Sequence, residues 1–228
     1  MSADVPPLEW FKDRHKGERC FLIGNGPSLA RLDLGKLAGE LAFTFNRGYL
    51  AYDLGLPKTP YYMVTDPLTY GPYAEEIRRA SVGTRFYRSD VCDLPEYREA
   101  IDREAAIRVP FHRAPTIDEG HFAEDATEGV FRGFTVLLDA AQLAFMMGCD
   151  KVFVIGCDLD YEKGQTHVYG TGPIEQQRID VMPVARVLEA MAVTARVFRD
   201  HGRVFANAGV GGRLETIPRV RYETTNCL

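Results

Sequence analysis

A glycine-rich segment near the N-terminus, residues 24–28, has the composition of a site for a phosphate-bearing ligand. It follows an apolar run, 19–23, and such a run bounded by glycine is typical of a buried parallel strand. Two glycines at a strand-to-helix turn let the backbone approach an anion closely. The spacing is neither the GxGxxG dinucleotide fingerprint nor a phosphate loop with its lysine. The candidate ligand-binding residues are Gly24, Asn25, Gly26, Pro27 and Ser28. The alternative is a plain tight turn in which Ser28 caps the next helix.

Polar residues also follow the other predicted strands. In an open α/β sheet, ligands bind at the carboxyl ends of the strands, where backbone amides and helix N-termini point outward. The apolar runs 42–45, 61–64, 151–155 and 204–206 are the strand candidates. The polar or glycine residues just beyond their ends are Asn46, Asp66, Gly156, Asp158, Asp160 and Asn207. We expect Asn207 to form a turn, whereas the others are candidates for the site.

One histidine, His167, lies in a polar, glycine-containing loop beyond the strand 151–155. An imidazole has an ordinary pKa of about 6.5 and can act as a general base at neutral pH. The alternative is a surface histidine without a chemical role. We expect the other four histidines to be surface or loop residues; they are His15, His112, His121 and His201.

The elements that must hold these residues alternate between strands and helices. Residues 135–147 contain good helix formers and stop at Gly148, and the apolar β-branched run 151–155 follows. This pair is typical of a βαβ unit. A helix is predicted from about 176 to 201, because its apolar residues recur at helical spacing. We therefore predict an α/β fold with a mostly parallel, Rossmann-like sheet flanked by helices.

The remaining segments show weaker patterns. Leucines after Ser28 predict a short helix or a pair of helical turns. Between 70 and 107 the pattern is mixed, with a charged helix at 75–80 and a strand at 85–87. Polar residues with several glycines predict an active-site flap at about 161–172. We interpret residues 1–228 as a single catalytic domain that carries this flap.

Composition limits the class of partner. The chain has 228 residues, 46% hydrophobic and 26% charged, with a net charge of -5, so a packed core is expected. No basic stripe with interleaved aromatics is present, and we expect no nucleic-acid partner. No apolar run is long enough to span a bilayer, and residues 1–10 do not resemble a signal peptide, so we expect a cytoplasmic protein. The five cysteines contain no CxxC pair and predict buried thiols rather than a zinc site.

The glycine turn and three later blocks together resemble the bacterial sialyltransferases of glycosyltransferase family 42. The sequence GNGPSL at 24–29 resembles the family's segment after its first strand. Asn46 and the Asp66-Pro67 pair follow in the family's order. The helix, glycine and strand from 140 to 158 look like its Gly-x-Asp unit, and 166–169 is similar to the context of its essential histidine. The ordered combination is more specific than any single block.

This resemblance implies a metal-independent, inverting transfer from a CMP-linked sugar to an acceptor hydroxyl. It implies that His167 deprotonates the acceptor and that Tyr161 or Tyr169 hydrogen-bonds the leaving phosphate. The residues that it implies for the nucleotide are Asn25, Ser28, Asn46 and Asp66, with Thr135 nearby. Asp66 stands where the family has an amide, and Thr135-Val136 stands where it has Thr-Ser. The expected partners are a nucleotide-sugar donor and a glycan or small-molecule acceptor, and a homo-oligomer is left open.

A second family is similar at the same motifs. The archaeal-type 6-hydroxymethyl-dihydropterin pyrophosphokinases and their bacterial relatives look alike at GxGPSL, at the GxDL strand end and at a following Thr-His. This resemblance implies diphosphoryl transfer from ATP with Mg²⁺ held by Asp66, Asp158 and Asp160. The structural alternative is that Asp158 bonds loop amides. Arg47 and Arg132 are further candidates to balance phosphate charge, and a nucleotide-binding module without catalysis is a third interpretation.

Overall fold

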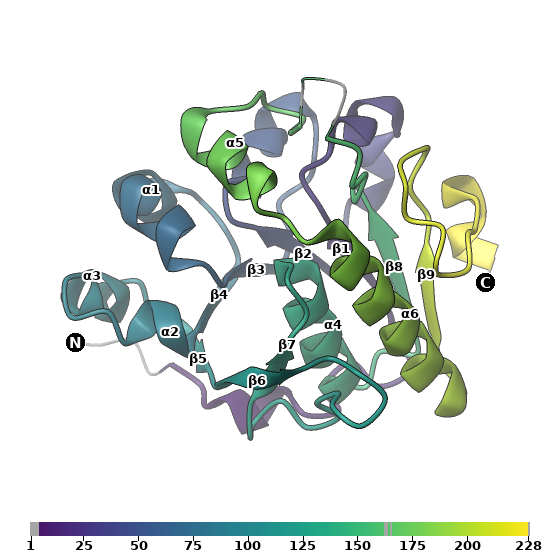
Figure 1. Cartoon of the computed structure of the whole chain (residues 1–228), viewed down its shortest axis with the longest axis horizontal. Coiled ribbons are helices and arrows are strands. Elements are labelled where there is room, and N and C mark those ends of the chain that lie inside the picture. The colour runs from purple at the N-terminus through teal and green to yellow at the C-terminus, as the bar shows by residue number, and fades with distance from the viewer. Residues whose placement is uncertain (1–4, 162–163, 165, 228) are drawn as a thin grey trace.

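The computed structural model describes residues 5–161, 164 and 166–227, and in it seven parallel strands form one sheet (Figure 1). The order of the strands across the sheet is β5-β4-β3-β2-β1-β8-β9. The predicted Rossmann-like α/β fold is confirmed. The strands are β1 (Arg19–Ile23), β2 (Ala42–Phe45), β3 (Tyr61–Val64), β4 (Thr84–Arg88), β5 (Ile107–Val109), β8 (Lys151–Ile155) and β9 (Val204–Asn207).

The strand order reverses between β1 and β8. From β1 the chain builds the sheet outward through β2 to β5, and it later returns to place β8 on the other side of β1. The connections after β1 and β8 therefore leave on opposite sides and open a crevice at the carboxyl ends of the two strands. The residues after Ile23 and after Ile155 meet at this switch point.

Both faces of the sheet are covered, as the apolar strands require. Cys20 and Leu22 of β1 point into a core shared with the helices α4 (Val136–Met146) and α6 (Val184–Asp200). Phe21 and Ile23 point to the opposite core, beneath the 3₁₀ helices η2 (Pro27–Arg31), η3 (Leu34–Leu37) and η4 (Gly48–Leu54). This alternation follows from the two-residue period of a strand.

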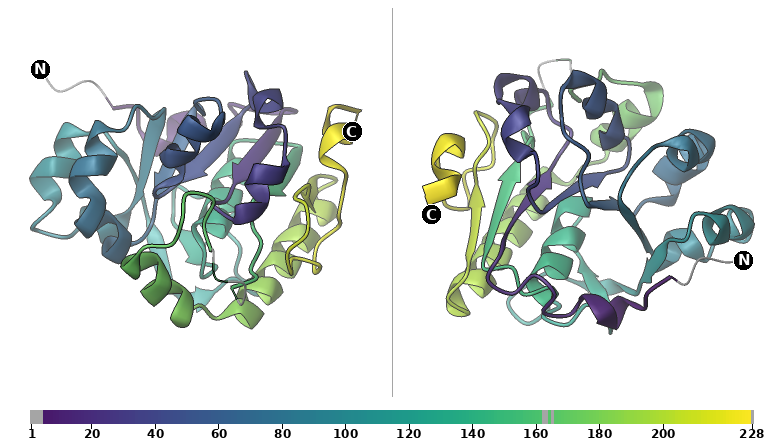
Figure 2. Two further views of the ribbon diagram at one scale, coloured as in Figure 1. Left: turned by 90° about the horizontal axis from the view of Figure 1, so that it is seen from above. Right: turned by 180° about the vertical axis from the view of Figure 1, so that it is seen from behind.

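The edges of the sheet carry the remaining elements. A third core, centred on Tyr62 and Tyr87, packs beneath α1 (Pro67–Arg79). Two short helices, α2 (Ser89–Cys92) and α3 (Arg98–Arg103), lie beyond β4, at the opposite edge from the C-terminal η5 (Tyr222–Cys227) (Figures 1 and 2). The N-terminal η1 (Leu8–Phe11) packs its apolar residues on the α4 side. No helix among the described residues is long and apolar enough to cross a membrane.

Several predicted elements differ from the structure at their boundaries. The helix predicted from 176 to 201 is two helices, α5 (Pro173–Asp180) and α6, with Pro183 at the N-cap of α6. Proline lacks the backbone N–H that a continuous helix needs, so the chain turns there. Ser28 is not a helix cap, because η2 begins at Pro27 with Gly26 as its N-cap. The charged segment 75–80 is the second half of α1.

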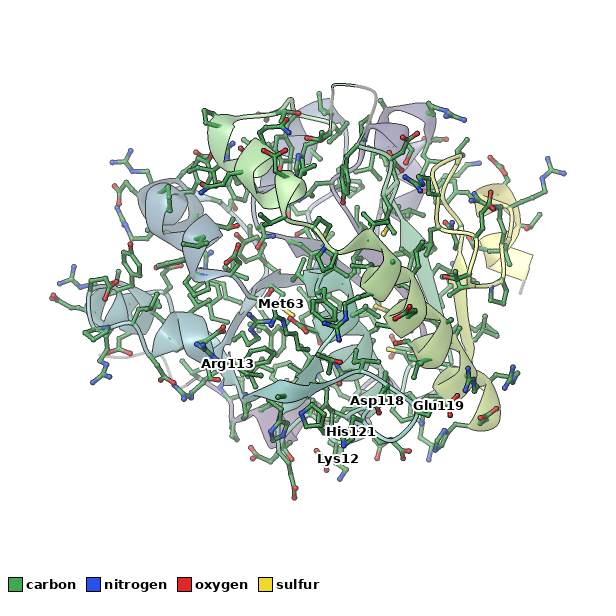
Figure 3. All side chains as sticks on the ribbon, in the orientation of Figure 1. Lys12, Met63, Arg113, Asp118, Glu119 and His121 are labelled. Carbon is green, nitrogen blue, oxygen red and sulfur yellow. The ribbon has the colours of Figure 1, made fainter. Side chains whose placement is uncertain are left out.

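A small parallel ribbon was not predicted. It joins β6 (Phe111–Thr116) to β7 (Val130–Arg132) and lies against α4. His121 lies in the connection between these strands, where its Nδ1 is 2.7 Å from an oxygen of Asp118 (Figure 3). This agrees with its prediction as a loop residue. His15 also lies in a turn, as expected of a surface or loop residue, but its ring is half-buried and its Nε2 lies 2.6 Å from the Tyr61 hydroxyl.

Candidate functional site

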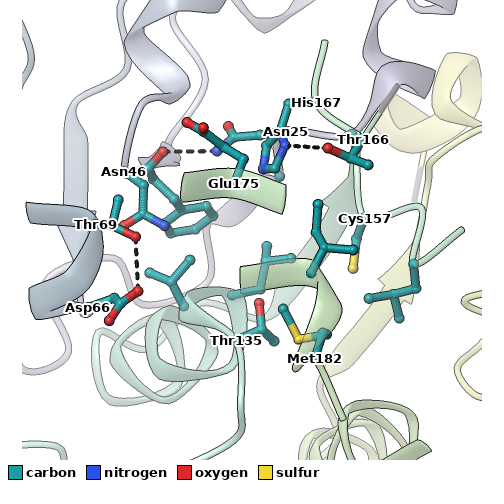
Figure 4. A pocket seen from close by; sticks show the side chains of 18 of the residues that line it. Asn25, Asn46, Asp66, Thr69, Thr135, Cys157, Thr166, His167, Glu175 and Met182 are labelled. Carbon is teal, nitrogen blue, oxygen red and sulfur yellow. Dashed lines mark hydrogen bonds between the residues drawn. The ribbon is translucent and has the colours of Figure 1, made fainter. Parts of the chain in front are cut away.

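A cavity of about 230 Å³, here called the pocket, opens at the switch point between β1 and β8 (Figure 4). Its walls come from the carboxyl ends of five parallel strands, the N-terminus of α4, the flap and the α5–α6 corner. Most of the predicted site residues line it. They are Gly24, Asn25, Gly26, Asn46, Asp66, Thr135, Gly156, Asp158, Asp160, Tyr161, His167 and Tyr169. Pro27 and Ser28 are not among the residues that line it.

The glycines of the predicted turn are required by the close approach of two backbones. A Cβ atom at Gly24 would lie 2.4 Å from the carbonyl oxygen of Gly156, and one at Gly26 would lie 2.7 Å from the same oxygen. The amide of Gly26 also donates a 2.8 Å hydrogen bond to that oxygen. Gly156 itself has a φ of +63°, which favours glycine. The glycines thus join the ends of β1 and β8, and the turn presents Asn25 to the pocket.

Asp158 fixes this turn from the end of β8. Its carboxylate accepts a 2.9 Å hydrogen bond from the Ser28 amide and a second from the Ser28 hydroxyl. Ser28 is therefore a positioning residue behind the pocket wall. Asp158 thus has the structural role that was predicted as the alternative to a metal ligand, a hydrogen bond to a nearby backbone amide. It also lines the pocket.

Two asparagines project from neighbouring strand ends. The side-chain amide of Asn25 donates a 3.2 Å hydrogen bond to the carbonyl oxygen of Phe45. Asn46 has a φ of +51°, a left-handed conformation that asparagine tolerates better than most residues. Its side-chain oxygen is buried and has no hydrogen-bond partner in the described part of the chain. A buried polar atom without a hydrogen-bond partner costs free energy. A bound ligand that donates a hydrogen bond to this oxygen would therefore stabilise the site.

His167 is held beside the glycine turn by the backbone. The amide of Val168 donates a 2.7 Å hydrogen bond to the carbonyl oxygen of Asn25. The hydroxyl of Thr166 lies 2.9 Å from the His167 Nδ1 and fixes the orientation of the ring. Burial lowers the pKa of His167, and the Glu175 carboxylate only partly opposes this effect. The imidazole is therefore neutral at pH 7 and can accept a proton.

The two candidate tyrosines lie on different parts of the pocket wall. The Tyr169 ring stacks on the His167 ring with their centroids 5.3 Å apart. Tyr161 packs against the core that contains α4. Burial raises the pKa of both hydroxyls, so each remains a proton donor at neutral pH. Part of the predicted flap, residues 162, 163 and 165, lies outside the described residues.

A comparison with solved structures finds a protein of similar fold. A solved structure, the MAf glycosyltransferase from Magnetospirillum magneticum AMB-1, matches with a TM-score of 0.56 and 12% sequence identity. The chain shares the fold of this glycosyltransferase. The match covers 98% of this chain and 40% of the other, so the chain spans less than half of that protein. No protein-family model matches the chain, and neither does any curated protein. The match agrees with the predicted Rossmann-like α/β fold.

An ion-pair network that the sequence analysis did not predict links α5 to the end of β2. Arg47 lies 3.0 Å from an oxygen of Glu175 and 3.1 Å from an oxygen of Glu76, and it stacks over the Tyr73 ring. Burial alone raises the pKa of Glu175, but hydrogen bonds from its own backbone amide and from Arg47 outweigh burial and lower it. Arg47 and Glu175 are 128 residues apart, so no local pattern indicates the pair.

A second unpredicted ion pair lies at the end of β4. Arg88 lines the pocket and contacts Asp139 of α4 at 2.9 Å and Asp90 at 2.8 Å. Burial raises the pKa of Asp139 to about 6, although Arg88 opposes this effect. Arg88 ends a strand that was predicted, so the rule that strand ends carry the site could have selected it.

The carboxylates of the alternative magnesium site do not gather as a set of metal ligands. Within the described ranges, no group of three or more His, Cys, Asp or Glu side chains is arranged to hold a metal ion. Asp66 caps α1 by accepting hydrogen bonds from the Leu68 amide and, at 2.9 Å, from the Thr69 hydroxyl. Asn207 forms a turn, as expected, because its side-chain oxygen accepts a hydrogen bond from the Gly209 amide.

Proposed function

We propose that the chain is a glycosyltransferase that transfers a sugar from a CMP-linked donor to an acceptor hydroxyl with inversion of configuration. The observation that carries this proposal is the position of His167 against the glycine turn, through the 2.7 Å bond from Val168 to Asn25. A neutral base therefore lies in the same pocket as the backbone that would receive the donor phosphate. The shared fold of the MAf glycosyltransferase supports the reaction class.

Each wall of the pocket has a part in this reaction. Asn25 and Asn46 would bind the nucleotide with their amide groups, and the unpartnered oxygen of Asn46 would accept a hydrogen bond from it. The N-terminus of α4, with Thr135 at its N-cap, points toward the pocket and favours negative charge there. The sugar would then lie between the nucleotide and His167.

The chemical step forms one bond and breaks another. The acceptor oxygen attacks the anomeric carbon of the donor, and the bond from that carbon to the phosphate oxygen breaks. The electron pair of this bond leaves on the phosphate of CMP, and the acceptor proton passes to a ring nitrogen of His167. Attack from the face opposite the phosphate inverts the anomeric configuration. Tyr169 or Tyr161 would donate a hydrogen bond to the leaving phosphate.

Calorimetric titration with CMP, CTP, ATP and a pterin alcohol, each with and without Mg²⁺, tests the donor. We expect CMP to bind with a micromolar Kd that Mg²⁺ does not change. Mg²⁺-dependent binding of ATP or the pterin, with no heat from CMP, would instead support the pyrophosphokinase. Binding of CMP without turnover of any CMP-linked sugar would favour a nucleotide-binding module.

The pH profile of the reaction tests the role of His167. A general base must be neutral, so kcat/KM is expected to fall as the pH drops through the His167 pKa. Because burial lowers this pKa, the midpoint of the acid limb should lie below the ordinary value of 6.5. The measurement is the rate of CMP release from CMP-N-acetylneuraminate between pH 4.5 and 8. A midpoint above 6.5, or a flat profile, would contradict the assignment.

A further inference from the structure

Two arginines flank one aromatic ring at the rim of the pocket. The guanidinium carbons of Arg132 and Arg186 each lie 4.8 Å from the centre of the Phe134 ring. Arg132 and Phe134 line the pocket, and Arg186 belongs to the first turn of α6. The β7–α4 turn and the start of α6 thus direct two positive charges to one place.

These two arginines differ from the other arginines of the pocket. Arg47 and Arg88 each pair with two carboxylates. Arg132 and Arg186 are exposed, and neither forms an ion pair with any side chain that the structure describes. Arg186 also lies at the N-terminal end of a 17-residue helix, where the helix dipole disfavours a positive charge. Because both guanidinium groups lie against the same ring, their positive charges repel each other. A bound anion would relieve this repulsion.

The backbone holds Phe134 in an uncommon conformation. Its φ is +67°, a left-handed value that a bulky side chain rarely adopts. The preceding residue must be glycine, because a Cβ atom on Gly133 would lie 2.4 Å from the Cβ of Leu138 in α4. The turn is thus fixed against α4, and strain of this kind is concentrated at functional sites.

We propose that Arg132 and Arg186 form an anion subsite that binds a carboxylate or phosphate monoester of the acceptor. Arginine favours this chemistry, because its planar guanidinium matches the paired oxygens of such groups. The assignment to the acceptor rests on the proposed function, in which the nucleotide occupies the wall of Asn25. Thr135, next to Phe134 in the sequence, lies on the opposite wall from Asn25 and His167 (Figure 4). An acceptor that extends away from His167 would reach the two arginines.

The subsite is tested first by NMR of the arginine Nε–Hε groups in the whole chain. Inorganic phosphate and N-acetylneuraminic acid are expected to shift the signals of Arg132 and Arg186 together. The methyl ester of the same sugar, which lacks the carboxylate charge, should leave both signals in place. Arg196, an exposed arginine of α6 that pairs with Glu119, is the control signal. Equal shifts at all three arginines, or no shift at all, would overturn the subsite.

A matched pair of variants then tests whether the charge of Arg186 contributes to the affinity for the free acid. Arg186→Gln should raise the Kd for N-acetylneuraminic acid at least about tenfold, because a charge-assisted hydrogen bond is lost. Arg196→Gln, on the same helix, should not change it. If Arg186→Gln weakens CMP-N-acetylneuraminate but not the free acid, the anion belongs to the donor and the acceptor assignment is wrong. If phosphate shifts the two signals while CMP does not bind, the subsite stands and the proposed glycosyltransferase function fails.

Discussion

His167→Ala is expected to lower the rate of sugar transfer by about 10²- to 10⁴-fold, the usual contribution of a general base. The affinity for CMP should change little, because the imidazole acts on the acceptor and not on the nucleotide. Two measurements are made on each variant. The first is the rate of CMP release from CMP-N-acetylneuraminate with water as the acceptor, and the second is calorimetric titration with CMP. This pairing separates loss of chemistry from loss of binding.

Two controls make this result specific to the base. His121→Ala removes a histidine in the β6–β7 connection, where it pairs with Asp118, and it should leave the rate unchanged. Added imidazole should restore part of the activity of His167→Ala by accepting the proton in place of the lost ring. Activity of His167→Ala within threefold of the unaltered chain would exclude His167 as the base.

Arg88→Met is expected to lower the free energy of unfolding by about 3–5 kcal/mol at pH 7.5. The substitution leaves the Asp139 carboxylate, which is 2% exposed, without its cation. Asp139 then either stays ionised, which costs free energy because its buried charge is unpaired, or takes up a proton. The measurement is urea unfolding of the unaltered chain and of Arg88→Met, monitored by circular dichroism.

The pH dependence identifies the cause of this loss. The pKa of Asp139 is already raised in the folded chain, and removal of Arg88 raises it further. A raised carboxyl pKa means that the folded state binds the proton more tightly, so stability falls as the pH rises through the folded pKa. The loss in Arg88→Met should therefore shrink to about 1 kcal/mol near pH 4.5, where the unfolded carboxyl also begins to protonate.

Two further variants complete the test. The double variant Arg88→Met with Asp139→Leu removes both charges and should recover most of the lost stability, because no buried charge remains. Arg108 lies on the neighbouring strand β5 and forms an exposed ion pair with Asp93. Arg108→Met breaks this pair and should change the free energy of unfolding by less than about 0.5 kcal/mol. An equal loss in Arg88→Met and in the double variant would show that packing of the arginine, rather than its charge, stabilises the fold.

The order of the main elements and the centre of the candidate site could be predicted from the amino-acid sequence. Six strands of the sheet, β1 to β4, β8 and β9, were predicted, because short apolar runs bounded by glycine or polar residues are typical of buried strands. Asn25, Asn46 and His167 were predicted as site residues because each follows a strand or lies in a polar loop. These patterns involve residues that are close together in the chain, so they can be recognised in a single sequence.

Contacts between residues far apart in the sequence could not be predicted and follow from the packing of the folded chain. Pro183 divides a helix that the apolar spacing had predicted as continuous, and this break brings α5 over the pocket. The pairs Arg47–Glu175 and Arg88–Asp139 and the arginines around Phe134 join segments about 50 or more residues apart. The physical reason is that an ion pair has no sequence period. It depends on where two segments pack, and the folded sheet alone fixes that position.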